Sequence, residues 1–473
     1  MQMERKGKQL DCFFSPSSVA VIGASPKHPV TSVILRNFIS GKYSGKIYPV
    51  NPKYEEIFGL KCYKSILEIP DQVDLAVIAI PAPAVPKVVE ECGKKGVKGA
   101  VVISGGFKEI GPEGAERERK LVEAAKKYNM RIIGPNCIGV LDTVTGVDTF
   151  FLPPERMKRP KPGGMAFISQ SGAFAAAICD WAASEGIGLG KCISYGNKSD
   201  VDDSDLLEYL SEQPDVKVIA AYIEGVDPGE GPEFMKAIKN ASKKKPVLVV
   251  KAGKTKRGTA AVASHTGSLA GSYTIYKYAI KQSGGIEVPN FEEMFDAVKA
   301  FLTQPLPKGN KVLIVTNGGG CGVMTVDAAE SLGLVVPEVP EELQRKLRET
   351  GHFPPHTILH NPIDVTGDTD ALRYKLALDV VLPTDVVDAA IVDLLFQTPN
   401  LGLEVVDYIA ECAQRYNKPI LVAYVGGEFA LKGIKRLEEK GVPCYPSPER
   451  AVKALYYLVK YSEWLEKQEK VGE

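Results

Sequence analysis

Residues 18–26 read SVAVIGASP. The β-branched run at 19–23 predicts a strand, and a turn of small residues follows it. A dinucleotide-binding unit would carry three spaced glycines here, and the second and third are missing. Small residues at a strand end still let backbone amides approach a phosphate at a helix N-terminus. We therefore expect Gly23, Ala24, Ser25 and Pro26 to bind a nucleotide-like ligand other than NAD, with an ordinary turn as the alternative.

Short β-branched runs alternate with longer amphipathic ones along the chain, which is typical of parallel sheets with crossover helices on both faces. The predicted fold class is α/β, with three doubly wound parallel-sheet domains. Besides 19–23, strands are expected at 46–50, 75–80, 100–104, 131–133, 166–169, 192–195, 218–223, 247–250 and 312–316.

Two segments are expected to separate the domains. Residues 153–164 are rich in proline, glycine and basic side chains, which continue neither a strand nor a helix. A second boundary is expected at 304–310. The predicted domains are 1–152, 165–304 and 311–473, which suits a chain of 473 residues.

Composition excludes several classes of function. Lys plus Arg and Asp plus Glu both count 58, so no nucleic-acid partner is expected. The first dozen residues are mostly polar and no run of 18 apolar residues occurs, so we expect a cytoplasmic protein without a membrane partner. The 9 cysteines are never two or three apart, so no zinc ribbon or redox pair is expected.

Polar and turn-forming residues follow the other predicted strands of the first domain. The carboxyl ends of parallel strands share one edge of a sheet, so these residues converge on one crevice. Singly, each is more typical of a turn than of a ligand site. The candidates are Asn51, Lys53, Pro81, Pro83, Ser104 and Asn136.

In the second domain, Ser169, Gln170, Ser171 and Gly172 end a predicted strand and begin an apolar helix. Hydroxyls and free amide donors would meet there, which predicts an anion or phosphate site. An ordinary serine N-cap is the alternative.

Residues 258–272 form the most unusual segment, because 12 of the 15 are Gly, Ala, Ser or Thr. We interpret it as a loop that approaches a ligand or moves, with His265 at its centre. An imidazole is a nucleophile that can carry a phosphoryl group if an acceptor holds its other nitrogen. Glu224, which follows the predicted strand 218–223, is the candidate acceptor; a solvated loop acid is the alternative.

Two further clusters imitate metal sites. His352, His356 and His360 are spaced by four, but Pro354 and Pro355 would break a helix between them. The acidic run Asp200, Asp202, Asp203 and Asp205 lacks the glycine and glutamate of a calcium loop, so we interpret it as helix capping. No metal site is predicted.

In combination and order, these motifs resemble the α subunits of ADP-forming acyl-CoA synthetases, the acetyl-CoA synthetase type related to succinyl-CoA synthetase. The resemblance covers nearly the whole chain. It rests on residues 19–25, 134–136, 169–172, 195–197 and 264–267.

The resemblance implies a Rossmann-like CoA-binding domain followed by two flavodoxin-like ligase domains. It also implies that His265 is phosphorylated, that Glu224 orients it, and that phosphate attacks the thioester near residues 169–172. The family reaction converts acyl-CoA, ADP and phosphate to acid, ATP and CoA through an acyl phosphate and a phosphohistidine.

No segment matches an ATP-grasp domain or a P-loop. ADP or ATP with Mg is therefore expected on a separate β subunit with an ATP-grasp domain, and the resemblance implies an α2β2 assembly. The acyl group stays open among acetyl, branched-chain and aryl, as does ADP against GDP. The rival hypotheses are a noncatalytic CoA-binding or regulatory protein and, disfavoured by the missing glycines, an NAD-dependent dehydrogenase.

Overall fold

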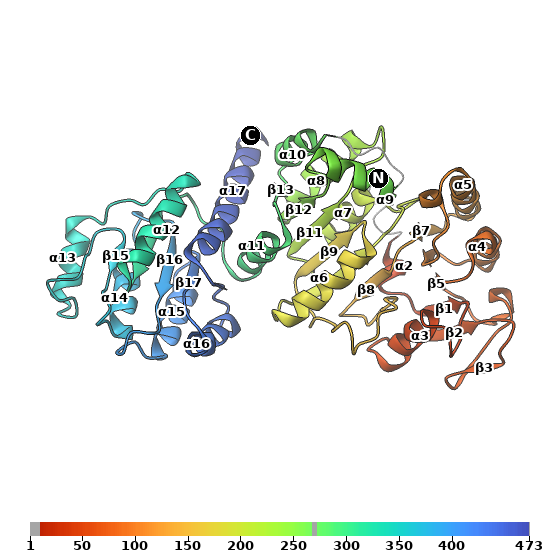
Figure 1. Cartoon of the computed structure of the whole chain (residues 1–473), viewed down its shortest axis with the longest axis horizontal. Helices are drawn as coiled ribbons and strands as arrows, with labels where there is room; N and C mark the ends of the chain where they lie inside the picture. The colour runs from red at the N-terminus through yellow and green to blue at the C-terminus, as the bar shows by residue number, and fades with distance from the viewer. Residues whose placement is uncertain (1–9, 267–271, 473) are drawn as a thin grey trace. The chain divides into compact units, whose positions relative to one another are not determined.

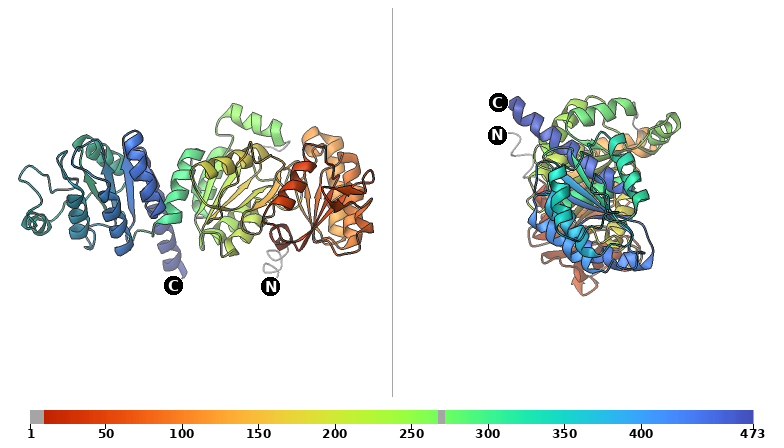
Figure 2. Two further views of the ribbon diagram at one scale, coloured as in Figure 1. Left: turned by 90° about the horizontal axis from the view of Figure 1, so that it is seen from below. Right: turned by 90° about the vertical axis from the view of Figure 1, so that its left-hand side faces the viewer.

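The computed structural model describes residues 10–266 and 272–472. It contains three large sheets that are parallel apart from one edge strand, with helices on both faces of each, and these confirm the predicted α/β class (Figure 1; Figure 2). A small two-stranded antiparallel sheet is also present. By internal contacts the chain divides into two compact units between Val288 and Pro289. The first unit holds two of the large sheets and the second unit holds the third.

The first sheet has the strand order β2-β1-β5-β6-β7, with every pair parallel. Its order reverses beside β1, where a doubly wound sheet opens a crevice. The strands are β1 (Ser18–Ile22), β2 (Lys46–Val50), β5 (Leu75–Ile78), β6 (Gly99–Val102) and β7 (Arg131–Ile133). The other elements are α2 (Asp11–Phe14), α3 (Thr31–Ser40), β3 (Glu56–Ile57), β4 (Leu60–Lys61), η1 (Ile66–Glu68), η2 (Ala82–Ala84), α4 (Val85–Lys95), η3 (Lys108–Ile110) and α5 (Pro112–Lys127).

Strand β1 shows why apolar runs become strands here. All five of its residues are buried, and alternate side chains enter different cores. Val19 and Val21 join one hydrophobic cluster, whereas Ala20 and Ile22 join another. Successive side chains point to opposite faces of a strand, so a continuous apolar run suits a sheet covered on both sides.

The second sheet has the order β13-β12-β11-β9-β10-β8. Its strands are β8 (Gly139–Asp142), β9 (Met165–Ser169), β10 (Leu189–Ser194), β11 (Val218–Ile223), β12 (Val247–Lys251) and β13 (Ile286–Glu287). The helices are α6 (Gly172–Ser184), α7 (Asp203–Glu212), α8 (Gly231–Ser242), α9 (Lys256–Thr266) and α10 (Tyr273–Gln282).

Strand β8 was not foreseen from the sequence. It lies within the range predicted for the first domain, yet it pairs antiparallel with β10 at the edge of the second sheet. Thr149 supports it, since its hydroxyl accepts from Val140 N at 2.8 Å. The segment before the proline-rich boundary therefore contributes to the second sheet.

The third sheet has the order β15-β14-β16-β17-β18. Its strands are β14 (Val312–Thr316), β15 (Ile363–Asp364), β16 (Ala389–Leu394), β17 (Ile420–Tyr424) and β18 (Cys444–Tyr445). The helices are α11 (Phe291–Thr303), α12 (Gly319–Ser331), α13 (Glu341–Glu349), α14 (Ala371–Val381), α15 (Glu404–Arg415), α16 (Glu428–Glu439) and α17 (Pro448–Gly472).

Helix α11 belongs to the second compact unit, although the sequence placed it in the second predicted domain. Its Asp296 is buried and pairs with Arg450 of α17, with two N–O distances of 2.7 Å. The three domain ranges stay predictions; the contacts show that residues 291–303 pack with the third sheet.

The segment around His265 differs from the predicted loop. Helix α9 runs to Thr266, so residues 258–266 are helical, and the loop interpretation is wrong for them. Alanine is the strongest helix former, and the run Ala260, Ala261, Val262 and Ala263 supplies that propensity. The side chain of His265 and residues 267–271 lie outside the described part of the structure.

Candidate functional site

The carboxyl edge of the first sheet brings the predicted ligand residues together. Gly23 has φ +88°, and a Cβ there would lie 2.4 Å from the Ala79 carbonyl oxygen. Only glycine suits both conditions, so the end of β1 approaches the segment after β5 closely. This close approach lies where the strand order reverses.

Two of the predicted ligand side chains tie strand ends to one another. Asn51 Nδ2 donates to the Ala24 carbonyl at 2.8 Å. Ser104 Oγ bonds both the amide and the carbonyl of Ile80, at 3.1 and 2.5 Å. The side chains of Asn51 and Ser104 therefore stabilise turns, as the alternative interpretation expects. Of the other predicted ligand residues at this edge, Ser25 and Pro26 are half-buried, and Lys53, Pro81 and Pro83 are exposed.

A cavity of about 280 Å³ joins the first two sheets at their carboxyl ends. Predicted residues from both sheets line it: Asn136 from the first, and Gln170, Ser171 and Gly172 from the second. Its remaining lining residues are Ile103, Lys108, Cys137, Ile138, Phe151, Ala173, Gly196, Asn197, Lys198, Gly225 and Asp227. The structure thus unites two candidate sites that the sequence could only treat separately.

The turn at Gly196 holds Asn136 in place. Asn136 adopts a left-handed conformation with φ +60°, which Asn tolerates better than most residues. Gly196 lies so close that a Cβ on it would be 2.3 Å from the carbonyl oxygens of Pro135 and Asn136. Asn197 N also donates to the Pro135 carbonyl at 2.9 Å.

Ser169 and Ser171 build the entry to helix α6. Ser171 is the N-cap residue, and its hydroxyl accepts from Phe174 N. Ser169 Oγ accepts from Ser171 N at 3.1 Å and donates to the Ser171 carbonyl at 2.7 Å. The N-cap alternative therefore holds for Ser171, and the first residues of the helix face the cavity, where the helix dipole favours an anion.

Both polar atoms of the Gln170 side-chain amide have protein partners. Its Oε1 accepts from the amides of Glu224 and Gly225 at 2.6 and 3.0 Å. Its Nε2 donates to the Gly225 carbonyl at 2.7 Å and to Asp203 at 3.1 Å. The side chain is buried and holds the turn after β11. That Gln170 binds phosphate stays a prediction.

Glu224 lies at the end of β11, as expected, and is only 3% exposed. Burial raises the pKa of the neighbouring Tyr222 hydroxyl, and the charge and hydrogen bond of Glu224 raise it further. The solvated-acid alternative does not describe Glu224, because the residue is buried.

Lys251, which the sequence analysis did not single out, supports the turn that carries Glu224. It ends β12, is 1% exposed, and donates from Nζ to the Glu224 carbonyl at 2.7 Å. Its ammonium lies 4.5 Å from the centre of the Tyr276 ring. Burial lowers its pKa to about 8, and the charge of Glu224 acts in the opposite direction. The sequence did carry one indication of this contact, a lysine at the end of an otherwise apolar strand.

A second missed group surrounds Asn197. Its Nδ2 donates to Glu109 Oε2 at 2.7 Å and to Glu118 Oε2 at 2.9 Å. Burial raises the pKa of Glu118. Lys108 lies beside this group and bridges Glu118 and Asp227 at 3.8 and 3.9 Å. The first sheet's η3 is thereby linked to the turn after β11.

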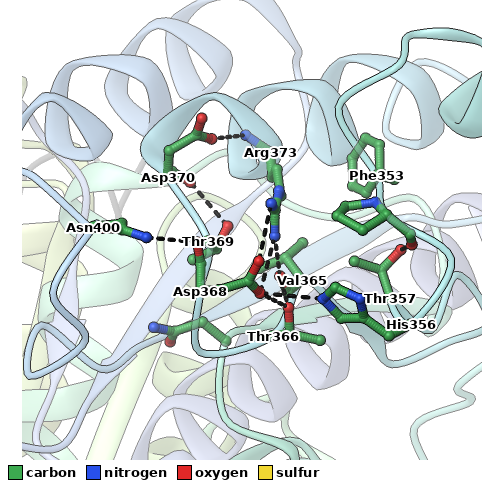
Figure 3. A network of polar contacts seen from close by, with 12 residues as sticks. Phe353, His356, Thr357, Val365, Thr366, Asp368, Thr369, Asp370, Arg373 and Asn400 are labelled. Atoms are coloured by element: carbon green, nitrogen blue, oxygen red, sulfur yellow. Dashed lines mark hydrogen bonds and ion pairs between the residues drawn. The ribbon is translucent and has the colours of Figure 1, made fainter.

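In both clusters that resemble metal sites in the sequence, a side chain interacts with other protein groups. Asp202 caps α7, accepting from the amides of Ser204 and Asp205 at 2.9 Å each. His356 pairs with Asp368, which also bonds Thr366 and Arg373 (Figure 3). Within the described residues, no three His, Cys, Asp or Glu side chains group so that they could hold a metal.

The described helices include none that is long and apolar enough to cross a membrane. None of the nine cysteines, all of which lie in the described part of the chain, forms a disulfide, and eight of them are buried, which fits a structural role.

Three family models match successive parts of the chain. A CoA binding domain matches residues 17–143, a succinyl-CoA ligase like flavodoxin domain matches 162–301, and a ligase-CoA domain matches 312–469.

Curated relatives match nearly the whole chain. It is 46% identical over 467 residues to acetate–CoA ligase [ADP-forming] I subunit alpha of Pyrococcus furiosus, covering 96% of this chain and 98% of that protein. It is 42% identical to acetate–CoA ligase [ADP-forming] I of Archaeoglobus fulgidus, covering 96% of this chain and 64% of that longer protein.

A solved structure shares the architecture. The dinucleotide forming acetyl-coenzyme A synthetase 1 of Ca. Korarchaeum cryptofilum, in complex with phosphate and ADP, matches with a TM-score of 0.90 and 38% identity, covering 97% of this chain and 98% of that one. Because the match to the Pyrococcus furiosus subunit is strong and nearly complete, the chain belongs to the family of ADP-forming acetate–CoA ligases, as a counterpart of their alpha subunits.

Proposed function

We propose that this chain is the catalytic α subunit of an ADP-forming acyl-CoA synthetase that converts acyl-CoA, ADP and phosphate to acid, ATP and CoA. The observation that carries the proposal is the shared cavity: Asn136 of the first sheet meets Gln170, Ser171 and Gly172 of the second within it. A CoA-binding domain and a phosphate-binding turn must meet if phosphate is to attack a thioester.

In the first proposed step, a phosphate oxygen attacks the thioester carbonyl carbon. The carbon–sulfur bond breaks, CoA leaves as the thiolate and takes up a proton, and an acyl phosphate remains. Backbone amides at the start of α6 offset the negative charge that develops on the carbonyl oxygen.

In the second step, an imidazole nitrogen of His265 attacks the phosphorus of the acyl phosphate. The bond between phosphorus and the acyl oxygen breaks, and the acid leaves as its carboxylate. Glu224 accepts a hydrogen bond from the other ring nitrogen and so fixes the tautomer. In the third step, an ADP oxygen attacks the phosphorus, the P–N bond breaks, and ATP forms.

CoA is assigned to the carboxyl edge of the first sheet, at Gly23–Pro26, Asn51, Lys53, Pro81, Pro83, Ser104 and Asn136. The contacts of Asn51 and Ser104 give those two a supporting role, in which they shape the edge rather than donate to the ligand.

ADP with Mg is assigned to a β subunit with an ATP-grasp domain, in an α2β2 complex. Support comes from the Pyrococcus furiosus relative, which is named as a subunit alpha, and from the longer Archaeoglobus fulgidus relative, of which this chain matches 64%. A cytoplasmic location stays a prediction.

The test uses the full chain with and without its candidate β subunit, acetyl-CoA and radiolabelled phosphate, followed by peptide mapping. Acid-labile label on His265 is expected, and none on His265→Asn. His352→Asn is the matched control, because His352 is exposed in the third domain and should leave labelling unchanged. CoA binding without label, with the partner and several acyl-CoAs present, would establish the noncatalytic alternative instead.

A further inference from the structure

The turn that carries Glu224 is held by side chains from three other elements. Gln170 Oε1 accepts from the Glu224 amide at 2.6 Å, and Lys251 Nζ donates to the Glu224 carbonyl at 2.7 Å. Two residues further on, Val226 N donates to the Tyr276 hydroxyl at 2.8 Å. The paired register of β11 and β12 ends one residue before Glu224, so these side chains, and not the β-ladder, fix the position of the turn.

Lys251 is placed where only a strong reason would keep a lysine. It is 1% exposed, and each of the three donors of a buried ammonium needs an acceptor. Besides the Glu224 carbonyl, its Nζ donates to the Ala252 carbonyl, and the Tyr276 ring centre lies 4.5 Å away. The rest of β12 is apolar, so a methionine would fill the same space without the cost of burying a charge. The lysine therefore indicates a role beyond packing.

Lys251 and Tyr276 lie on either side of His265 in the chain. Lys251 ends β12 and precedes α9, which includes His265, whereas Tyr276 belongs to α10, the next helix. Both residues contact the turn after β11, Lys251 at Glu224 and Tyr276 at Val226. They also contact each other through the ammonium and the ring. The chain is thus bonded to the Glu224 turn both before and after the segment that carries His265.

Resting on the proposed function, we propose that Lys251 and Tyr276 are positioning residues for the phosphorylation of His265. They hold the Glu224 turn against both ends of the His265 segment, and so keep the Glu224 carboxylate where it can accept from the imidazole. Thioester cleavage, which takes place at the start of α6, does not depend on them. Loss of either contact should therefore slow phosphoryl transfer to His265 and spare the step before it.

The experiment measures the two steps separately, using the full chain with its β subunit. Arsenate with acetyl-CoA reports the first step. An arsenate oxygen attacks the thioester carbon, the carbon–sulfur bond breaks, and water hydrolyses the acyl arsenate to acid and arsenate, so CoA thiol is released without His265. Radiolabelled phosphate with acetyl-CoA reports the second step as acid-labile label on His265. His265→Asn should release CoA with arsenate and take no label.

Lys251→Met keeps the length of the side chain and removes its donors. It should lower the initial rate of His265 labelling roughly tenfold, because about that factor is lost with a hydrogen bond to a charged group. Arsenate-dependent CoA release and the KM for acetyl-CoA should stay within about twofold of the wild type. Tyr276→Phe removes only the hydroxyl that accepts from Val226 N, and should change labelling in the same direction by a smaller factor.

Lys245→Met is the matched control. Lys245 also donates from Nζ to two backbone carbonyls, those of Leu210 and Gln213, but it lies at the opposite end of β12 from Glu224. It loses the same charge and the same kind of contact, and it should leave both labelling and CoA release unchanged.

Folding of each variant is followed by thermal unfolding, and Tyr276→Phe serves if Lys251→Met fails to fold. Unchanged labelling in the folded variants would overturn the positioning role. So would labelling and arsenate-dependent CoA release that fall by the same factor, because a merely structural role would lower both. In either case the wild type still labels His265, and the proposed function stands. A wild type that releases CoA but takes no label on His265 would overturn the proposed function, and the positioning role with it.

Discussion

The Gln170 side chain hydrogen-bonds both the backbone amide and the backbone carbonyl of Gly225. The Gln170 Oε1 accepts from the Gly225 amide at 3.0 Å, and its Nε2 donates to the Gly225 carbonyl at 2.7 Å. The side-chain amide thus satisfies the same backbone donor and acceptor that a neighbouring β-strand would satisfy. This contact couples the turn at the start of α6 to the turn that carries Glu224.

Changing Gln170 to Glu should lower kcat roughly tenfold to hundredfold. A carboxylate cannot donate to the Gly225 carbonyl, and it would bring a second negative charge beside Asp203. Steady-state kinetics with acetyl-CoA checks this. Gln282→Glu, an exposed change at the end of α10, is the control and should leave kcat unchanged. Equal kcat values for the two variants would contradict the coupling.

Replacing Gly196 with Ala should disable the site, whereas Gly186→Ala should not. Gly196 has φ +51° and Gly186 has φ +70°. The left-handed backbone conformation therefore destabilises both alanine variants by a similar amount, about 1 kcal/mol. Only at Gly196 would the new Cβ meet backbone atoms, those of Pro135 and Asn136, while nothing lies within 4 Å at Gly186. Thermal unfolding and activity are compared; retained activity in Gly196→Ala would show that the position of Asn136 is unimportant.

Arg131→Met should destabilise the first unit by about 3 kcal/mol. Arg131 is half-buried and pairs with Asp200 at 2.9 Å and Asp205 at 2.5 Å, so its loss leaves two carboxylates uncompensated. Arg119→Met removes exposed pairs on α5, which solvent screens, so it should destabilise the protein much less than Arg131→Met. Denaturant unfolding of both variants provides the measurement, and similar costs would refute the argument.

Asp393 should make the third sheet more stable at mildly acidic pH. Burial raises its pKa from 3.8 to about 7, with Glu449 adding to the rise and the Thr325 hydroxyl opposing it. Between these two pH values the folded state holds a proton that the unfolded state has lost, so the free energy of unfolding falls as pH rises.

Relative to Asp393→Asn, the wild type should therefore lose about 3 kcal/mol of stability between pH 4 and pH 7. Hydrogen exchange of the β16 amides, compared between the two proteins at each pH, reports this directly. The comparison removes the pH dependence of exchange itself. A constant difference across the range would mean that Asp393 is ionised throughout.

The sequence by itself determined the fold class and the five strands of the first sheet, but it left β15, β16, β17 and β18 of the third sheet unassigned. Residues 19–22 and 312–315 are apolar throughout, and a parallel sheet covered on both faces buries every side chain of such a run. It also placed Glu224 and residues 169–172 at strand ends, because those positions depend on local order along the chain.

The tertiary structure alone decided which of those positions meet. Gln170 contacts Gly225 across 55 residues, and Lys251 contacts Glu224 across 27, distances at which no local pattern reports a partner. For the same reason, pairing of β8 with β10 and packing of α11 with α17 were not foreseen. At residues 258–266 the sequence analysis predicted a loop from the many small residues, but the structure has a helix there. The local helix propensity of the alanines explains this difference.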